Sequence, residues 1–258
     1  MKSVHQINAQ QYQGKAQQYL NSQVHATGEE FTKILKEVKP TDHVLDLGCG
    51  GGHVSYNIAS YVQNVIAYDL SNDMLEIVRH TVQEKQLKNI KTQQGVAEQL
   101  PFQSASFDVV ISRYSAHHWQ DIHQAVQEIK RVLKPNGVFI LIDTMSSNTP
   151  IFNTFLQTIE FIRDPSHVKN YSLPEWSDIA EQAQLEIRNF QMQNLYLNFA
   201  TWIERMAPPQ SSIETLQFLQ KNACDQVKKY FKLTDQGDFS LRVGYLKIVN
   251  NDNEINSL

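Results

Sequence analysis

The sequence predicts a doubly wound α/β fold, in which a mostly parallel sheet is covered by helices on both faces. Two observations lead to this prediction. Between residues 43 and 143, short apolar runs alternate with segments whose apolar residues recur at helical spacing, as in a chain that returns to its sheet through helices. The runs at 43–47, 64–70, 107–112 and 137–143 are also nearly continuous in apolar character, which is typical of parallel strands buried on both faces.

Helix signals separate these strands. After Thr27, apolar residues repeat at helical spacing from Phe31 to Val38, behind two glutamates, and Pro40 ends the pattern. The segment LKPNG at 133–137 is typical of a helix stop and a turn before the next strand. Polar residues able to cap a helix precede the other periodic segments, namely Ser71 or Asn72 and Asp121.

The second half of the chain has a looser pattern, which we interpret as helical insertions and further strands on the same sheet. Helical stretches are expected near 151–163, 174–183 and 199–231, and strands near 185–193 and 239–249. The last of these alternates apolar and polar residues, which suits an antiparallel strand closing the edge of the sheet. We therefore expect a single domain, 1–258, made of an N-terminal arm (1–26), a core (27–145) and a region of lid helices and sheet-closing strands (146–258).

Composition excludes several classes of protein. The 258 residues carry 23 Lys and Arg against 27 Asp and Glu, and no basic stripe is present, so nucleic acid is not an expected partner. The 2 cysteines form no disulfide framework and no metal-ligand pattern, which fits a reducing compartment without a bound metal. No apolar run approaches the length of a membrane span. We expect a cytoplasmic monomer or homodimer that acts on a small molecule, away from membranes.

The sharpest motif is VLDLGCGGG at 44–52, placed between a buried strand and a helix. Glycines here let the backbone turn tightly and approach a ligand closely, beside the free N–H groups that begin the helix. A dinucleotide fingerprint would need glycine at the position of His53, and a Walker A loop would need a lysine that is absent. Asp46 ends the strand, where its carboxylate would repel a diphosphate but attract a cation.

A second acidic residue, Asp69, ends the next strand about 20 residues after the glycines, at the offset from which a carboxylate reaches the hydroxyls of a ribose. The expected ligand is therefore a nucleoside that carries positive charge. S-adenosylmethionine, with its adenosine, sulfonium and ammonium groups, meets that description.

The motif series HVLDLGCGGGHVS, AYDLSNDML, GVAEQLPFQSASFDVVIS and RVLKPNGVFILID resembles the class I S-adenosylmethionine-dependent methyltransferases. The resemblance is strongest to the type 11 group related to ubiquinone and menaquinone biosynthesis enzymes, and it spans roughly residues 30–145. It implies a Rossmann-like seven-stranded sheet, S-adenosylmethionine as cofactor, and methyl transfer to oxygen, carbon or nitrogen of a small organic acceptor.

Carried over position by position, the resemblance places the methionine part of the cofactor against Asp46 and the glycines, the ribose against Asp69, and the adenine beside Leu70 and Met74. Val96 stands where the family usually has an aspartate that accepts from the adenine amino group, so Glu98 or backbone carbonyls would have to substitute. Met74 is equally consistent with ordinary helix packing. The residues expected to bind the cofactor are Tyr19, Asp46, Gly48, Gly50, Gly52, Asp69, Leu70, Met74, Val96, Ala97, Glu98 and Arg113.

Which residue acts as the general base depends on the chemistry of the methyl acceptor. His117 and His118 follow the fourth apolar run, at the switch point of the sheet, and either imidazole can act near neutral pH. His25 and His167 are rivals from the expected lid segments. The alternative for all of them is simple packing. The alternative function is a protein that binds S-adenosylmethionine or S-adenosylhomocysteine without transferring a methyl group.

Overall fold

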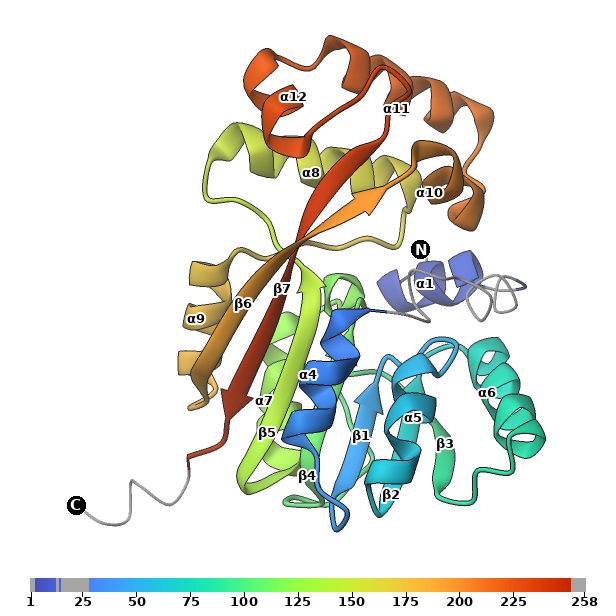
Figure 1. Ribbon diagram of the computed structural model, residues 1–258, viewed down its shortest axis with the longest axis vertical. Helices are drawn as coiled ribbons and strands as arrows, with labels where there is room; N and C mark the ends of the chain where they lie inside the picture. Colours follow the sequence, from blue (N-terminus) through green and yellow to red (C-terminus); the bar gives the residue numbers. More distant parts are fainter. Residues whose placement is uncertain (1–2, 13, 15–27, 252–258) are drawn as a thin grey trace.

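The computed structural model describes residues 3–12, 14 and 28–251, and its centre is a seven-stranded sheet of order β3-β2-β1-β4-β5-β7-β6 (Figure 1). Neighbouring strands from β3 to β5 run parallel. β7 runs antiparallel to both β5 and β6. The strands are β1 (His43–Leu47), β2 (Asn64–Asp69), β3 (Ile90–Gln94), β4 (Phe107–Arg113), β5 (Leu133–Thr144), β6 (Glu186–Leu197) and β7 (Phe239–Val249).

The predicted Rossmann-like class is confirmed. The antiparallel strand lies one position in from the edge, and β6 forms the edge itself. Two local differences have physical reasons. β3 was not among the predicted strands because its sequence, IKTQQ, is polar and mostly exposed at the other edge. LKPNG lies within the span of β5, where a register shift against β4 and the left-handed φ of 63° at Asn136 accommodate the expected turn.

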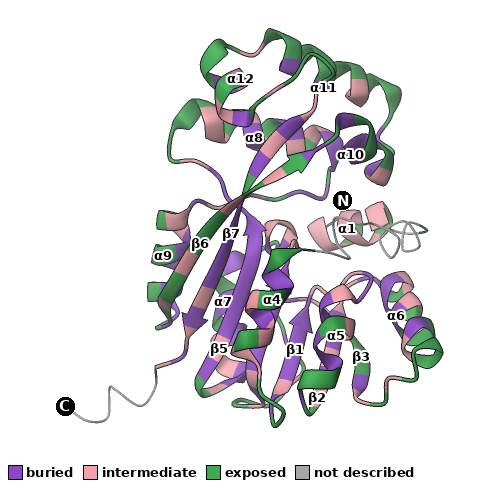
Figure 2. Ribbon diagram, viewed as in Figure 1, coloured by how far each residue is buried: buried purple, intermediate pink, exposed green. Residues whose placement is uncertain are grey.

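Helices cover both faces of the sheet, and the strands between them are its most buried elements (Figure 2). Side chains alternate between the faces, so Val44 packs with α4 and α5 while the next residue, Leu45, packs with α7 and α9. This two-sided burial explains the continuous apolar runs of the sequence. These helices, with α6 beside β2 and β3, are α4 (Glu29–Glu37), α5 (His53–Ile58), α6 (Asn72–Glu84), α7 (Ile122–Val132) and α9 (Leu173–Gln182).

A third hydrophobic cluster lies outside the central layers. The far ends of β6 and β7 extend beyond the other strands into a group of helices (Figure 1). Pro208 and Pro209, and then Ala223 and Cys224, interrupt the helical stretch that the sequence predicts at 199–231. The group consists of α8 (Pro150–Arg163), α10 (Phe199–Met206), α11 (Gln210–Asn222) and α12 (Asp225–Phe231).

The N-terminal arm forms helix α1 (Val4–Tyr12), which has no buried residue. Figure 1 shows α1 between the carboxyl ends of the parallel strands and the helices α8 and α10. Every helix within residues 3–12, 14 and 28–251 is too short or too polar to cross a membrane. The predicted site residues at the carboxyl ends of β1, β2 and β4 therefore lie at the edge of the sheet that is nearest α1.

Candidate functional site

The glycine-rich turn after β1 takes the backbone shape that its sequence predicts. Gly48 has a φ of +75°, and a Cβ there would lie 1.9 Å from Oγ of Ser115. Only glycine fits such a position without strain. The N–H groups of Gly48 and Cys49 donate to the carbonyl of Tyr68 on the neighbouring strand, at 2.8 and 3.0 Å. The turn is therefore fixed against β2, with bare backbone facing the space above the strand ends.

Asp46, near the end of β1, is 1% exposed. Its Oδ2 accepts hydrogen bonds from the backbone N–H and the hydroxyl of Ser55, at 3.0 and 2.6 Å. Burial nevertheless dominates and raises the pKa of Asp46 to about 7, although the two bonds from Ser55 oppose the rise. A carboxyl group in this state favours a bound cation, because a nearby positive charge stabilises its ionised form.

Asp69 closes β2, and both of its carboxylate oxygens are oriented by backbone groups. Oδ2 accepts from Gly50 N–H at 2.8 Å, and Oδ1 accepts from Ser71 N–H at 2.8 Å. Burial raises the pKa of Asp69, and these two hydrogen bonds act in the opposite direction. Each oxygen has a further lone pair with which it can accept from a ligand, so the carboxylate is presented in a fixed orientation to a pair of hydroxyls.

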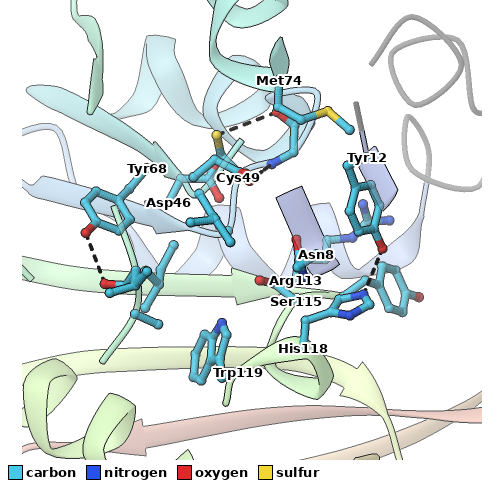
Figure 3. Close-up of a pocket in the computed structure, with 18 of the residues that line it drawn as sticks. Asn8, Tyr12, Asp46, Cys49, Tyr68, Met74, Arg113, Ser115, His118 and Trp119 are labelled. Atoms are coloured by element: carbon cyan, nitrogen blue, oxygen red, sulfur yellow. Dashed lines mark hydrogen bonds between the residues drawn. The ribbon is translucent and has the colours of Figure 1, made fainter. Parts of the chain in front are cut away.

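These groups line one cavity, called here the first cavity, with an empty volume of about 1000 Å³ including its open mouth. Leu70, Met74, Val96 and Ala97 form an apolar wall, which suits the flat face of an aromatic base. The hydroxyl of Tyr68 donates to the carbonyl of Val96 at 3.1 Å and fixes that wall. Figure 3 shows Asp46, Met74, Arg113 and His118 around the same space.

Glu98 also lines the first cavity, but its carboxylate has other contacts. Its Oε1 accepts from the backbone N–H groups of Gln120 and Asp121, at 2.7 and 3.2 Å, just before α7. Its Oε2 lies 3.2 Å from Nε2 of His5 on α1. Val96 cannot supply a side-chain hydrogen-bond acceptor for the adenine amino group. That acceptor would have to be the Glu98 carboxylate, which already has these partners, or a main-chain carbonyl nearby.

Arg113 lies at the end of β4 and is paired across the cavity wall. Its Nη2 donates to Oε1 of Glu30 on α4 at 2.7 Å, and both side chains are 4% exposed. The guanidinium also lies 4.8 Å from the ring centroids of Phe31 and Tyr114. The ion pair with Glu30 and the stacking on these two rings hold the guanidinium in one orientation at the cavity.

Helix α1 contributes residues that periodicity does not single out as ligands. His5, Asn8 and Tyr12 line the first cavity, and Figure 3 shows Asn8 and Tyr12 on the side away from the strands. The Tyr12 hydroxyl lies 2.8 Å from Nε2 of His118 and 3.2 Å from Oδ2 of Asp164. Tyr12 is an aromatic residue in an otherwise polar arm. This contrast is the sequence signal that could have placed it at the cavity.

A second cavity, with an empty volume of about 670 Å³, adjoins the first, and Tyr12, Tyr114 and His118 line both. His117 lies on its wall, where Nδ1 is 2.7 Å from Oδ1 of Asp143 at the end of β5. His167 is also on this wall. The remaining lining residues are Thr144, Glu160, Arg163, Asp164, Asn170, Leu195, Leu197, Trp202, Arg205 and Leu241.

The structure brings nearly all the described cofactor candidates to the first cavity. Gly52 is the exception, because it begins α5 with a φ of +83° and is not part of the lining. Tyr19 and His25 lie outside the described residues. Sequence reasoning missed lining residues of ordinary type, namely His5, Asn8, Cys49, Tyr68, Ser115 and Trp119.

The residues present fit S-adenosylmethionine. A buried carboxyl at Asp46 suits a cationic amino acid part, an oriented carboxylate at Asp69 suits a ribose, and the apolar wall suits an adenine. Within the described residues, no group of three or more His, Cys, Asp or Glu side chains is arranged to hold a metal ion.

Comparisons with known proteins agree with this geometry. Residues 45–141 match a family described as a methyltransferase domain. The chain is 42% identical to the uncharacterized protein YafE of Escherichia coli over 193 residues, 75% of this chain and 93% of that protein. A demethylmenaquinone methyltransferase of Lactococcus lactis is 39% identical over 112 residues, 42% of this chain and 44% of that protein.

The uncharacterized methyltransferase YcgJ of Bacillus subtilis is 35% identical over 229 residues, 88% of this chain and 90% of that protein. The crystal structure of YcgJ superposes with a TM-score of 0.82 at 34% identity, covering 85% of this chain and 97% of that chain. Fold, strand-end carboxylates, glycine turn and relatives thus agree, and the chain belongs to the class I S-adenosylmethionine-dependent methyltransferases.

Proposed function

We propose that this methyltransferase acts on a small organic acceptor, at oxygen, carbon or nitrogen, that enters the second cavity. The observation that carries the proposal is the adjacency of the two cavities, which share Tyr12, Tyr114 and His118 as a common wall. A pocket of this size, enclosed by helices and strand ends, suits a small molecule better than a polymer. The net charge of −4 also argues against nucleic acid.

The cofactor residues have distinct proposed roles. Asp46 faces the cationic methionine part, and Asp69 accepts from the two ribose hydroxyls. The adenine lies against Leu70 and Met74, with Val96, Ala97 and Glu98 along its edge. Arg113, held by Glu30, completes the set around the methionine end, and Tyr19, which lies outside the described residues, keeps its proposed role in cofactor binding. The bound cofactor supplies a methyl group already activated by its sulfonium, so the protein has to align the reactants and exclude water.

The setting of the enzyme is proposed on composition and topology. We place it in the cytoplasm, as a monomer or homodimer without membrane or nucleic-acid partners. The cysteine usage supports a reducing compartment, since Cys49 and Cys224 are both free thiols. The arm, core and lid regions are proposed to act as one domain, because β6 and β7 join the lid helices to the same sheet as the core.

Calorimetric titration with S-adenosylhomocysteine tests the cofactor site. Asp69→Asn should weaken binding by about tenfold or more, since two hydrogen bonds to a charged acceptor are degraded. Asp178→Asn, at an exposed position on α9, is the matched control and should bind like the parent. Equal affinity in all three proteins would remove the ribose assignment.

Turnover tests the function itself. Incubation of the enzyme with isotopically labelled S-adenosylmethionine and a bacterial metabolite extract should label a small molecule. A protein that binds the cofactor without transferring methyl would show the calorimetric heat and leave every metabolite unlabelled. The replacement of the usual aspartate by Val96 is the feature that favours this second candidate.

A further inference from the structure

The residues that line the second cavity indicate the chemistry of its ligand as well as its size. Any assignment of that ligand rests on the proposed function. Two sets of polar groups on the wall of this cavity bear on the acceptor. One set is a histidine held by a carboxylate, and the other is a pair of buried polar atoms that lack partners among the described residues. Together they restrict what the acceptor can be.

His117 has the arrangement of an oriented base. Asp143 is 2% exposed, and its Oδ1 lies 2.7 Å from Nδ1 of His117 while its Oδ2 accepts from the backbone N–H of the same residue at 3.2 Å. The acceptor at Nδ1 keeps the hydrogen on that nitrogen, which leaves the lone pair on Nε2. Burial lowers the pKa of His117, but the charge and hydrogen bond of Asp143 outweigh it and raise the pKa above the usual value.

His118 is differently arranged, although it is nearer the first cavity. Its Nδ1 lies 3.1 Å from the carbonyl oxygen of Ser166, which can only accept, so Nδ1 carries the hydrogen. Its Nε2 lies 2.8 Å from the Tyr12 hydroxyl, which also donates to Oδ2 of Asp164 at 3.2 Å. Burial and the neighbouring His117 lower the pKa of His118 to about 4. Both nitrogens are therefore occupied, and the ring is a weak base.

Two buried polar atoms on the same wall have no partner in the described part of the chain. Nε2 of His167 lies 2.9 Å from Oε1 of Gln157, an oxygen that also accepts from the backbone N–H of Asn170. Nε2 therefore donates, and Nδ1 is an acceptor that no described donor reaches. Nδ2 of Asn170 is a donor that no described acceptor reaches. His167 is 5% exposed and Asn170 is 2% exposed. Buried groups of this kind are normally satisfied, so their positions indicate a polar ligand group.

The charges around the cavity are balanced. Arg163 lies 3.6 Å from Glu160 and stacks on Trp202, with 4.7 Å between the guanidinium carbon and the ring centroid. Asp164 accepts from the Tyr12 hydroxyl at 3.2 Å and also faces the charge of Arg163, while the charge of Arg205 on α10 faces Glu160. The rest of the wall includes the apolar side chains Leu195, Leu197 and Leu241. A cavity whose charged groups are already opposed by one another favours an uncharged guest with an apolar body.

We infer that the second cavity takes an uncharged, hydroxyl-bearing molecule, that His117 held by Asp143 removes the proton of the reacting hydroxyl, and that His167 and Asn170 bind a second hydroxyl. The acceptor oxygen forms the new bond to the methyl carbon. The bond between that carbon and sulfur breaks with its electron pair on sulfur, and the hydroxyl proton passes to Nε2 of His117. The product is a methyl ether.

Imidazole titration by nuclear magnetic resonance gives a readout that does not require turnover. In the protein saturated with S-adenosylhomocysteine, His117 should titrate above the usual range of a histidine, and Asp143→Asn should lower its midpoint. The charged groups that face His117 are Asp143 from β5, Glu160 and Arg163 from α8, Asp164 and His167 from the segment after α8, Arg205 from α10, and the adjacent His118.

Binding of probes can be read from the same spectra. Catechol, resorcinol and 1-naphthol are the uncharged probes, with phenethylamine and benzoate as charged controls. We expect the uncharged diols to shift the signals of His117 and His167 and to leave His123 unchanged. His117 and His167 signals that respond only to the amine or the carboxylate, or to none of the probes, would overturn the acceptor class.

Kinetics with the labelled acceptor separate the base from a structural residue. His117→Gln should lower kcat by about a hundredfold or more with little change in KM. The positioning variant Asp143→Asn should move the rising limb of the pH–rate profile to lower pH. His123→Gln, at an exposed site on α7, should keep the parent rate. Unchanged rates in His117→Gln, or an N-methyl or C-methyl product, would overturn the inference while leaving methyl transfer intact. Absence of any methylated product alongside normal cofactor binding would instead overturn the proposed function.

Discussion

Replacement of the buried carboxyl by an amide, Asp46→Asn, should remove a pH-dependent part of the folding stability and weaken cofactor binding. The carboxyl is 1% exposed, and burial raises its pKa from 3.8 to about 7. Because the folded-state pKa lies above the unfolded value, this group favours the folded state most at low pH. That contribution is lost as the pH rises through about 7.

The size of the effect follows from those two values. Between about pH 5 and pH 8 the parent should lose about 2 to 3 kcal/mol of folding free energy through Asp46 alone. The asparagine variant has no such group. Its free energy of unfolding, relative to that of the parent, should therefore increase by that amount between about pH 5 and pH 8. The poorly satisfied amide N–H₂ costs the same at both pH values and cancels from the comparison.

Urea unfolding at the two pH values, without cofactor, measures the change. Asp178→Asn, exposed on α9, is the control and should follow the parent. In the same variants, calorimetry in buffers of different ionisation enthalpy should show proton release when S-adenosylmethionine binds the parent near pH 6, because the cation ionises Asp46. The Asp46→Asn protein should release no such proton and bind more weakly. A stability difference that is the same at both pH values would refute the reasoning.

Two further substitutions test the frame of the site. Gly48→Ala should destabilise the fold more than Gly50→Ala. A Cβ at Gly48 would lie 1.9 Å from Oγ of Ser115, while no described atom lies within 4 Å of a Cβ at Gly50. Tm values give the order, and adding Ser115→Gly to Gly48→Ala should restore part of the lost stability. Glu30→Gln should cost about 3 kcal/mol, because it removes the buried negative partner of Arg113. Urea unfolding beside the exposed Glu181→Gln checks this value, and equal stabilities would contradict it.

The central sheet could be predicted from the sequence because burial on two faces leaves a continuous apolar run. Val44 and Leu45 contact different helix layers, so neither position tolerates a polar residue. The edge strand β3 lacks that requirement, and its polar sequence IKTQQ carries no such signal. The helical stretch at 199–231 was predicted without its breaks. The first break is visible in the sequence as Pro208 and Pro209, whereas Ala223 and Cys224 at the second carry no such signal.

The first cavity was predictable for a related reason. Asp46, the glycines and Asp69 lie at consecutive strand ends, and parallel strands bring their carboxyl ends to one edge. The second cavity is lined by residues of α1, the segment after β4, β5, α8, β6, α10 and β7, which are far apart in the chain, and no local pattern links them. The partner of His117 is Asp143, whose position follows only from the register of β4 against β5. Helix α1 has no buried face, so it lacks a periodicity that could be interpreted.

We propose that the carboxylates of Asp46 and Asp69, with the bare turn at Gly48, form the binding site for the cofactor. A crystal structure of the protein soaked with S-adenosylhomocysteine would test this assignment. We expect both ribose hydroxyls within hydrogen-bond distance of the Asp69 carboxylate and the amino group of the ligand on the Asp46 side. Density for the ligand elsewhere, or side chains of the protein filling the first cavity, would contradict it.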